Sequence, residues 1–244
     1  MTIALVTGGT RGIGLATARA LAQTGACVLL TGRRLAAAEA ASSSLRQEGL
    51  DVQALELDVT SSASIAAAAE RVERDQGRLD VLVNNAGILP EATDATEHHF
   101  ANPDLVRATF EVNVFGPVAV TEAFLPLLQR SARARIVNLS TTMGSLTDQA
   151  DPDSPYYGTV VPGYQSSKAA LNSITIGLAK RLAATGIKVT SVCPGFVQTD
   201  LTPMNREQAP LAASQAAQVV LAAATLPDGA ASGTFVDANG PVAW

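Results

Sequence analysis

Short apolar runs alternate with longer alanine-rich segments along the chain, and this alternation constrains the fold more than any other feature. Each run is brief and almost wholly apolar, which is typical of strands that a parallel sheet buries on both faces. Parallel neighbours need crossover connections, usually helices. The pattern predicts an α/β fold with a doubly wound parallel sheet of about seven strands and helices on both faces. The expected strands are residues 2–6, 27–30, 52–56, 79–83, 135–139, 188–192 and 234–236.

The segments between these runs carry helix-forming residues at helical spacing. Gly25, Gly49, Gly77 and Gly186 follow four of them, where a left-handed C-terminal cap favours glycine, and Ser61 is a suitable N-cap for the third. No repeat or linker interrupts the pattern, so we expect one domain over residues 1–244. The expected helices are residues 13–23, 35–47, 61–76, 105–129, 165–184 and 206–225.

Composition and charge indicate which classes of partner the chain can bind. The 244 residues are 47% hydrophobic, enough for one sizeable core, and carry 17 basic against 22 acidic residues for a net charge of −5. Nucleic-acid binding needs a clustered cationic face, which these scattered charges do not supply. No apolar run reaches the ~20 residues of a membrane span. We therefore expect a small-molecule substrate, with no nucleic-acid or membrane partner.

Cysteine usage and the first residues favour a cytoplasmic protein. Cys27 and Cys193 each lie in an apolar stretch, as reduced buried thiols do. Residues 1–6 run straight into a glycine-rich turn, which leaves no room for a signal peptide. His98 and His99 are adjacent and so are not spaced to share a metal on one helix face. We expect no metal.

The glycine-rich turn at residues 7–14, Thr-Gly-Gly-Thr-Arg-Gly-Ile-Gly, joins the first expected strand to a helix. Glycine lets the backbone turn sharply and approach a pyrophosphate, and the helix N-terminus presents unpaired amides to it. A tight strand-to-helix connection alone would also use such glycines.

A second pattern places a phenol beside an ammonium group. Tyr164 and Lys168 are four residues apart, so on a helix they share one face, whereas no lysine follows Tyr156 or Tyr157 at that spacing. A nearby cation favours ionisation of a phenol whose ordinary pKa is about 10. Carbonyl reduction needs such an acid to deliver a proton as the alkoxide forms.

The order and spacing of these segments resemble the short-chain dehydrogenase/reductase family over nearly the whole chain. Residues 7–14 resemble its TGxxxGxG motif, residues 84–87 its NNAG motif, residues 164–168 its YxxxK motif and residues 194–199 its PGxxxT segment. The resemblance implies a Rossmann-type fold and an oxidoreductase that uses a nicotinamide dinucleotide.

The resemblance also implies catalytic roles. Tyr164 would donate the proton, Lys168 would assist it and hold the nicotinamide ribose, and Asn113 would bend its helix and hold a water in a proton relay. The family's substrate-orienting serine, three residues before a glycine, is Thr141 here. Ser140 stays an alternative, although adjacent strand residues point to opposite faces.

The implied cofactor site covers six regions of the chain. Asp58 is one of the implied cofactor-binding residues, but it could instead be a simple carboxylate at a helix N-terminus. The implied cofactor-binding residues are Gly8, Thr10, Arg11, Gly12, Ile13, Gly14, Arg33, Arg34, Asp58, Val59, Asn85, Ala86, Gly87, Tyr164, Lys168, Pro194, Gly195, Val197 and Thr199.

The end of the second strand favours NADPH/NADP+. Family members that use NADH carry an acid there, which binds the ribose hydroxyls and repels a 2′-phosphate. This chain has Gly32, Arg33 and Arg34 instead, and Arg33 offers a planar charged fork to a phosphate. Arg11 supplies a second cation. Alternatively, these arginines are solvated charges at the start of a helix.

We expect NADPH-dependent reduction of a ketone or aldehyde to an alcohol. The alternatives are an NAD-linked alcohol dehydrogenase, which Gly32 and Arg33 disfavour, and a non-catalytic NADPH-binding regulatory protein, which only Thr141 favours. The resemblance implies a homodimer or homotetramer through the long helices that carry Asn113 and Tyr164.

Two segments are less defined. Twenty-two residues separate Thr141 from Tyr164, about ten more than the resemblance implies, and residues 148–157 form an acidic, proline-containing insertion. We expect it to shape substrate access, with Tyr156 or Tyr157 as an aromatic wall, or else to be a solvent loop. Residues 201–210 would form a mobile lid.

Overall fold

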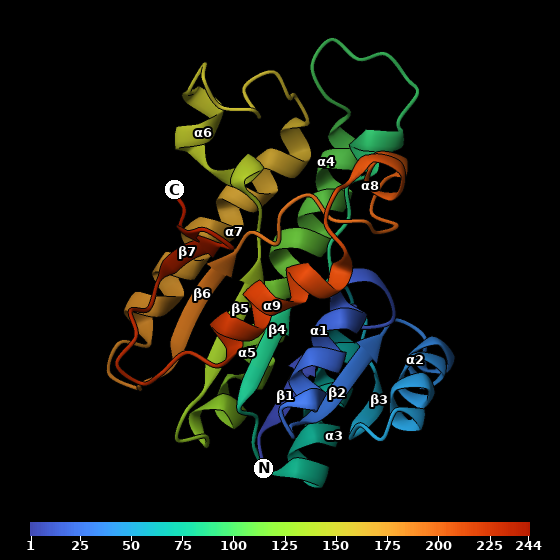
Figure 1. Ribbon diagram of the computed structural model, residues 1–244, viewed down its shortest axis with the longest axis vertical. Coiled ribbons are helices and arrows are strands. Elements are labelled where there is room, and N and C mark those ends of the chain that lie inside the picture. The colour runs from blue at the N-terminus through green and yellow to red at the C-terminus, as the bar shows by residue number, and fades with distance from the viewer.

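The computed structural model describes all 244 residues and contains one sheet of eight strands (Figure 1). The strand order is β3-β2-β1-β4-β5-β6-β7-β8, and every neighbouring pair is parallel except β7 with β8. The doubly wound parallel sheet is confirmed, with one strand more than expected because β8 has only two residues. The strands are β1 Ile3–Val6, β2 Cys27–Gly32, β3 Val52–Glu56, β4 Val81–Asn84, β5 Arg135–Leu139, β6 Lys188–Val192, β7 Thr234–Asp237 and β8 Gly240–Pro241.

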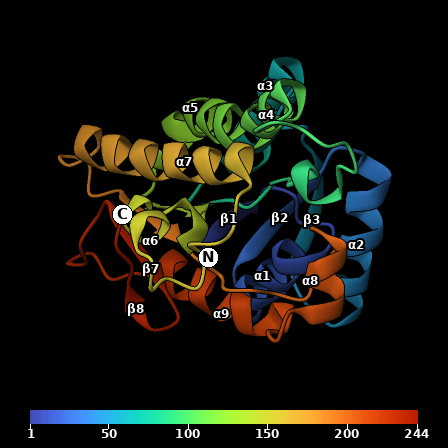
Figure 2. The ribbon, with the colours of Figure 1, turned by 90° about the horizontal axis from the view of Figure 1, so that it is seen from above.

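Helices cover both faces of this sheet. Seen from above, α3, α4, α5 and α7 lie on one side and α1, α8 and α9 on the other (Figure 2). The helices are α1 Gly12–Gln23, α2 Leu35–Gln47, α3 Ser62–Gln76, α4 Pro103–Phe110, α5 Gly116–Gln129, α6 Leu146–Ala150, α7 Pro162–Arg181, α8 Pro203–Gln208 and α9 Ala213–Ala224. Shorter turns are η1 Pro90–Thr93, the π-helical η2 Glu111–Phe115 and η3 Thr142–Gly144.

The sheet separates two hydrophobic cores. Ile3 and Leu5 of β1 belong to the core shared with α3, α5 and α7, whereas Ala4 and Val6 belong to the core shared with α1, α2 and α9. Successive side chains of a strand point to opposite faces. Both faces are covered, so the strands are mostly apolar, and this is why the sequence shows an alternation of apolar runs and helical segments.

Several expected element boundaries are wrong. The helix expected over residues 206–225 is split into α8 and α9, because Pro210 lacks an N–H and residues 209–212 are not helical. Leu211 pairs instead with the segment after β6, accepting the N–H of Gln198 at 2.8 Å. Helix α7 begins and ends earlier than expected, so Gly186 lies in a turn beyond it and is not its cap.

The helical stretch Pro103–Gln129 has 27 residues and includes an 18-residue window with a mean hydropathy of 1.3, so by length and composition alone it could cross a membrane. The stretch is not one uninterrupted apolar run, because it includes Asp104, Arg107 and Glu111. Half of the window is buried inside the protein. Val120, Phe124 and Leu128 pack in the core beneath α5. A core helix on a sheet has the same properties.

Phe124 is completely buried between α5 and the sheet. We predict that Phe124→Ala lowers the free energy of unfolding by about 3–5 kcal/mol, because it removes a large apolar side chain and leaves a cavity. Urea unfolding measures the loss. Phe100→Ala is the control, since Phe100 is 75% exposed and its removal should change stability by less than about 0.5 kcal/mol. Equal effects of the two substitutions would contradict this packing.

Candidate active site

The residues named from sequence gather at the carboxyl ends of the central strands, where open α/β sheets bind ligands. Thr7 follows β1 and contacts Asn85 after β4. Leu139, which ends β5, accepts a hydrogen bond from Lys168 of α7. Cys193, which follows β6, accepts one from the backbone N–H of Thr142. Segments far apart in the chain thus form one site.

The glycine turn is shaped to approach a pyrophosphate. Gly8 and Gly12 have φ of 62° and 55°, in the left-handed region that favours glycine. A Cβ on Gly14 would lie 2.4 Å from the carbonyl oxygen of Gly8, so no side chain fits there. Arg11, the N-cap of α1, makes no side-chain capping bond, which leaves the first amides of the helix for an anion. These residues fit a dinucleotide.

The segment after β4 is bonded to this turn. The Asn85 amide donates to the carbonyl oxygens of Thr7 and Gly8 at 2.7 and 3.1 Å. The Thr7 hydroxyl accepts the N–H groups of Asn85 and Ala86 at 2.9 and 3.0 Å and donates to the carbonyl of Val83. The NNAG-like segment at residues 84–87 therefore has a structural role, because it holds the glycine turn against β4.

Two arginines are exposed at the end of β2. Arg33 and Arg34 follow Gly32 and make no ion pair. A Cβ on Gly32 would lie 2.6 Å from the Thr10 methyl carbon, so Thr10 packs closely over it. The sequence reasoning missed Glu56, which is in register with Gly32 on β3 and accepts the N–H of Leu35 at 3.1 Å. This carboxylate caps α2.

Asp58 and Val59 lie between β3 and α3. The Asp58 carboxylate accepts both the N–H and the hydroxyl of Thr60 at 2.9 and 2.8 Å, so it orders the turn before α3. Val59 packs against Gly116, where a Cβ would lie 3.0 Å from a Val59 methyl carbon. Val59 thereby connects this turn to the start of α5.

Tyr164 and Lys168 are buried side by side on α7. The Lys168 amino group donates to the Leu139 carbonyl at 2.7 Å and lies 5.7 Å from the centre of the Tyr164 ring. Burial lowers the pKa of Lys168 to about 8. Burial, followed by the proximity of Cys193, raises the pKa of Tyr164 above its ordinary value. The lowering expected from Lys168 is therefore absent in the protein alone.

Asn113 occupies the π-helical turn η2 within the long helix, in agreement with the expected irregularity. Its side-chain oxygen accepts the N–H of Ile88 at 2.9 Å, and its amide donates to the Ile88 carbonyl at 3.0 Å and to the Ser167 hydroxyl at 3.2 Å. Gly87 lies beside it, since a Cβ there would be 3.4 Å from the Asn113 oxygen and 3.7 Å from the Lys168 nitrogen.

Thr141 and Ser140 differ in access. Ser140 still pairs with β6 through its N–H, and its hydroxyl is buried without a hydrogen-bond partner. Thr141 is partly exposed and caps η3 by accepting the N–H of Met143 at 3.3 Å. Of these two hydroxyl groups, that of Thr141 is the more accessible to a ligand in the site.

The segment after β6 reaches over the glycine turn. A Cβ on Gly12 would lie 3.3 Å from the Thr199 methyl carbon, and Gly195 has φ of 85°. Pro194 lies between β6 and Gly195, and the buried Val197 lies between Gly195 and Thr199. Asp200, which follows Thr199, lies 3.7 Å from Arg11 and also forms an ion pair with Arg206 of α8. The expected lid, residues 201–210, thus contains a short helix, and the ion pairs of Asp200 link it to the glycine turn.

The insertion before α7 has its own hydrogen bonds. The segment from β5 to α7 that includes it contains η3 and α6, and Thr147 of α6 donates its N–H and hydroxyl to the Trp244 carbonyl at 3.1 and 2.8 Å. The Gln149 amide donates to the Met143 carbonyl. Tyr156 is partly buried and Tyr157 is 53% exposed. Figure 1 shows the insertion beside the first turns of α7, at the same end of the molecule as α8.

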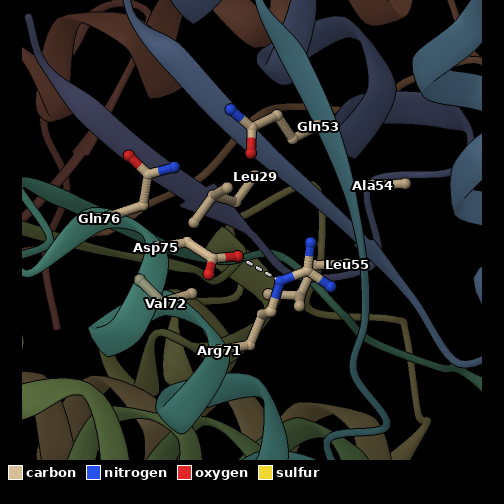
Figure 3. A pocket seen from close by; sticks show the side chains of 8 residues that line it. All are labelled: Leu29, Gln53, Ala54, Leu55, Arg71, Val72, Asp75 and Gln76. Carbon is tan, nitrogen blue, oxygen red and sulfur yellow. Dashed lines mark hydrogen bonds and ion pairs between the residues drawn. The ribbon is translucent and has the colours of Figure 1, made fainter.

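A small hollow elsewhere does not belong to this site. It lies at the edge of the sheet beneath α3, lined by Leu29, Leu55 and the paired Arg71 and Asp75 (Figure 3). Its volume is about 10 Å³. That is room for no more than about one water, so it cannot hold a substrate.

Comparisons with known proteins show the family and the fold to which this chain is similar. Residues 2–210 match the short chain dehydrogenase family. The chain is 36% identical over 206 residues to the short-chain dehydrogenase anuI of Penicillium roqueforti, covering 81% of this chain and 79% of that protein. It is 33% identical over 249 residues to (+)-neomenthol dehydrogenase of Arabidopsis thaliana, covering 81% and 83%. NADPH-bound carbonyl reductase from chicken fatty liver superposes with a TM-score of 0.85 at 27% identity, over 100% of this chain and 98% of that one.

The buried amino group of Lys168 predicts a pH dependence of stability. Its pKa is about 8 in the folded protein and about 10.4 in an unfolded chain, so the unfolded chain binds more protons between these values. Stability from this group therefore rises as the pH increases from about 8 to about 10.4. We predict that Lys168→Met removes this contribution, so that the unfolding free energy of the wild-type protein minus that of the variant increases with pH across that range in urea unfolding. The opposing contribution of the Cys27 thiol, whose pKa burial raises to about 11, is present in both proteins and cancels in this difference.

Lys180 of the same helix is exposed and provides the control. Lys180→Met should keep the pH dependence of the wild-type protein. A Lys168→Met variant whose stability follows the wild-type curve would mean that the buried amino group keeps its ordinary pKa.

Proposed function

Because this chain belongs to the short-chain dehydrogenase/reductase family and is thus an oxidoreductase, we propose that it reduces a ketone or aldehyde to an alcohol with NADPH and that Tyr164 is the general acid. The observation that carries the proposal is the buried pair of Tyr164 and Lys168 on α7, at the end of the sheet where the glycine turn lies. We further propose that residues 1–244 act as one dinucleotide-binding unit.

The residues of the chain have separate tasks in this reaction. When bound, the nicotinamide supplies a hydride to the carbonyl carbon. Tyr164 donates its phenolic proton to the carbonyl oxygen, and its raised pKa keeps it protonated until the alkoxide forms. Thr141, the more accessible hydroxyl, donates a hydrogen bond that polarises the same oxygen. Lys168 and Asn113 supply the path by which Tyr164 regains a proton.

The preference for NADPH is supported by charge. Arg33 and Arg34 are exposed and free of ion pairs beside Gly32, at the position where family members that use NADH carry an acid. The neighbouring structure of carbonyl reductase contains NADPH. Both observations disfavour an NAD-linked dehydrogenase, and the intact pair of Tyr164 and Lys168 disfavours a non-catalytic regulator.

We propose that the protein is a cytoplasmic homodimer or homotetramer, with a small carbonyl or alcohol compound as its substrate. Phe115 is 55% exposed and Val118 is 44% exposed on the helix that carries Asn113. Two exposed apolar side chains on one long helix support an interface there. We propose no nucleic-acid partner and no membrane partner for this protein.

The proposed reaction is tested by NADPH oxidation with a panel of ketones and aldehydes. We predict that Tyr164→Phe lowers kcat by about 10²- to 10⁴-fold, because it removes the proton donor without changing the packing of the ring. Tyr157→Phe is the matched control and should retain wild-type turnover, since Tyr157 is exposed in the insertion. Full activity of Tyr164→Phe would exclude the phenol as the acid.

The cofactor preference has its own test. We predict that Arg33→Ala raises the KM for NADPH by about 10- to 100-fold and leaves that for NADH unchanged, because a hydrogen bond to a charged group contributes about 1.5–3 kcal/mol. Steady-state kinetics with both cofactors measure the change. Arg46→Ala controls for the loss of an arginine, since Arg46 lies at the far end of α2. An equal loss with both cofactors would exclude recognition of the 2′-phosphate.

A further inference from the structure

The helix that carries Tyr164 begins without a capping side chain of its own. Its N-cap, Val161, has no side-chain acceptor, and Pro162 at the first helical position has no N–H. The next two N–H groups, of Gly163 and Tyr164, have no acceptor within the helix. Since Tyr164 lies in this first turn, whatever binds these two groups also determines the position of Tyr164.

Glu91 binds both of them. One of its carboxylate oxygens accepts the N–H of Gly163 at 3.0 Å, and the other accepts the N–H of Tyr164 at 2.7 Å. A carboxylate at a helix N-terminus is stabilised by the helix dipole as well as by these charge-assisted bonds. Glu91 comes from η1, 73 residues before Tyr164, so this is a tertiary contact and not a local cap.

The absence of a side chain at residue 163 makes this contact possible. A Cβ on Gly163 would lie 2.9 Å from the Glu91 carboxylate oxygen that binds Tyr164 and 3.1 Å from a methyl carbon of Val106. Contacts under 3.0 Å force a displacement. Any larger residue at 163 would therefore push Glu91 away from the Tyr164 amide.

Residues 88–91 also hold the backbone carbonyl of Tyr164, through Asn113 and Ser167. The Tyr164 carbonyl accepts the Ser167 hydroxyl at 2.7 Å, and Ser167 accepts the Asn113 amide at 3.2 Å. Asn113 in turn binds both backbone groups of Ile88, three residues before Glu91. The N–H and the carbonyl of Tyr164 are thus both fixed through residues 88–91.

We propose that Glu91 is a positioning residue, which holds the backbone of Tyr164 so that the phenol meets the carbonyl oxygen of the substrate. This proposal rests on the proposed function of Tyr164. Small displacements of a reacting group lower rates strongly, by up to about 10²-fold for about 1 Å. Glu91 does not touch the substrate and acts only through the amides of Gly163 and Tyr164.

Glu91→Gln tests the proposal with little change in shape. Glutamine can accept only one of the two N–H groups and turns a donor toward the other. We predict that kcat falls about tenfold or more, that the Kd of NADPH and the binding stoichiometry stay unchanged, and that the solvent deuterium isotope effect on kcat increases as proton donation by Tyr164 becomes slower. Amide hydrogen exchange should become faster over residues 162–166.

Glu97→Gln is the matched control, because Glu97 is an exposed carboxylate six residues further along the same segment with no hydrogen-bond partner. It should behave as the wild-type protein in every measurement. Gly163→Ala should reproduce the effects of Glu91→Gln, and the two changes combined should cost little more than either alone, because both break the same contact.

The outcomes separate this proposal from the proposed function. Unchanged exchange over residues 162–166 in Glu91→Gln overturns the contact whether or not turnover is seen. Faster exchange with unchanged kcat and isotope effect overturns the positioning role. A wild-type protein that binds NADPH but reduces no carbonyl overturns the proposed function, and the exchange measurement still decides whether Glu91 holds Tyr164.

Discussion

The burial of the Lys168 amino group is the constraint on which the site depends. A buried ammonium is costly unless polar groups replace water, and here the nearest acceptor is the Leu139 carbonyl at the end of β5. Helix α7 must therefore lie directly against that strand end. Gly144 permits this approach, since a Cβ there would lie 2.6 Å from the Lys168 Cβ. The position of Tyr164 follows from that of Lys168, because both project from the same face of α7.

A buried polar network extends the same arrangement into the core. Asn84 of β4 donates to Asn138 of β5 at 2.9 Å, Asn138 donates to Thr175 of α7 at 2.8 Å, and Ser191 of β6 also donates to Thr175. Hydrogen bonds between buried polar groups favour one packing of their elements, although the side-chain oxygen of Asn84 has no partner. These hydrogen bonds hold three central strands and α7 in one register behind Lys168.

The sequence predicted what depends on local chemistry and repetition. Burial on both faces makes most strand residues apolar, so most strands were predicted within two residues of their ends, and the bounds of β3, β5 and β6 were predicted as observed. The glycine turn could be predicted because its positive φ angles and its contact with Asn85 leave few other residue types possible. Tyr164 and Lys168 could be paired because helical spacing alone places them together.

Features that depend on tertiary contact could not be predicted. The pairing of Leu211 with the segment after β6 is such a contact, although Pro210 already indicated from the sequence that the helix breaks between α8 and α9. Glu91 lies far from Tyr164 in sequence, and an isolated glutamate has no pattern that indicates a contact with a distant helix. The raised pKa of Tyr164 likewise depends on burial, which the identity of its neighbours in the chain does not determine.

The π-helical turn η2 makes the length of the chain near Asn113 as important as its composition. A π-turn holds one residue more than an α-helical turn, and each residue rotates a helix by about 100°. Helix α4 packs on α7 while α5 packs on α3 and the sheet, and this offset lets one continuous helix serve both contacts. Deletion of a single residue between 111 and 115 would straighten the helix and turn one of those faces to solvent. Relatives that align with a gap in this turn would therefore have a differently built site, even where every named side chain is retained.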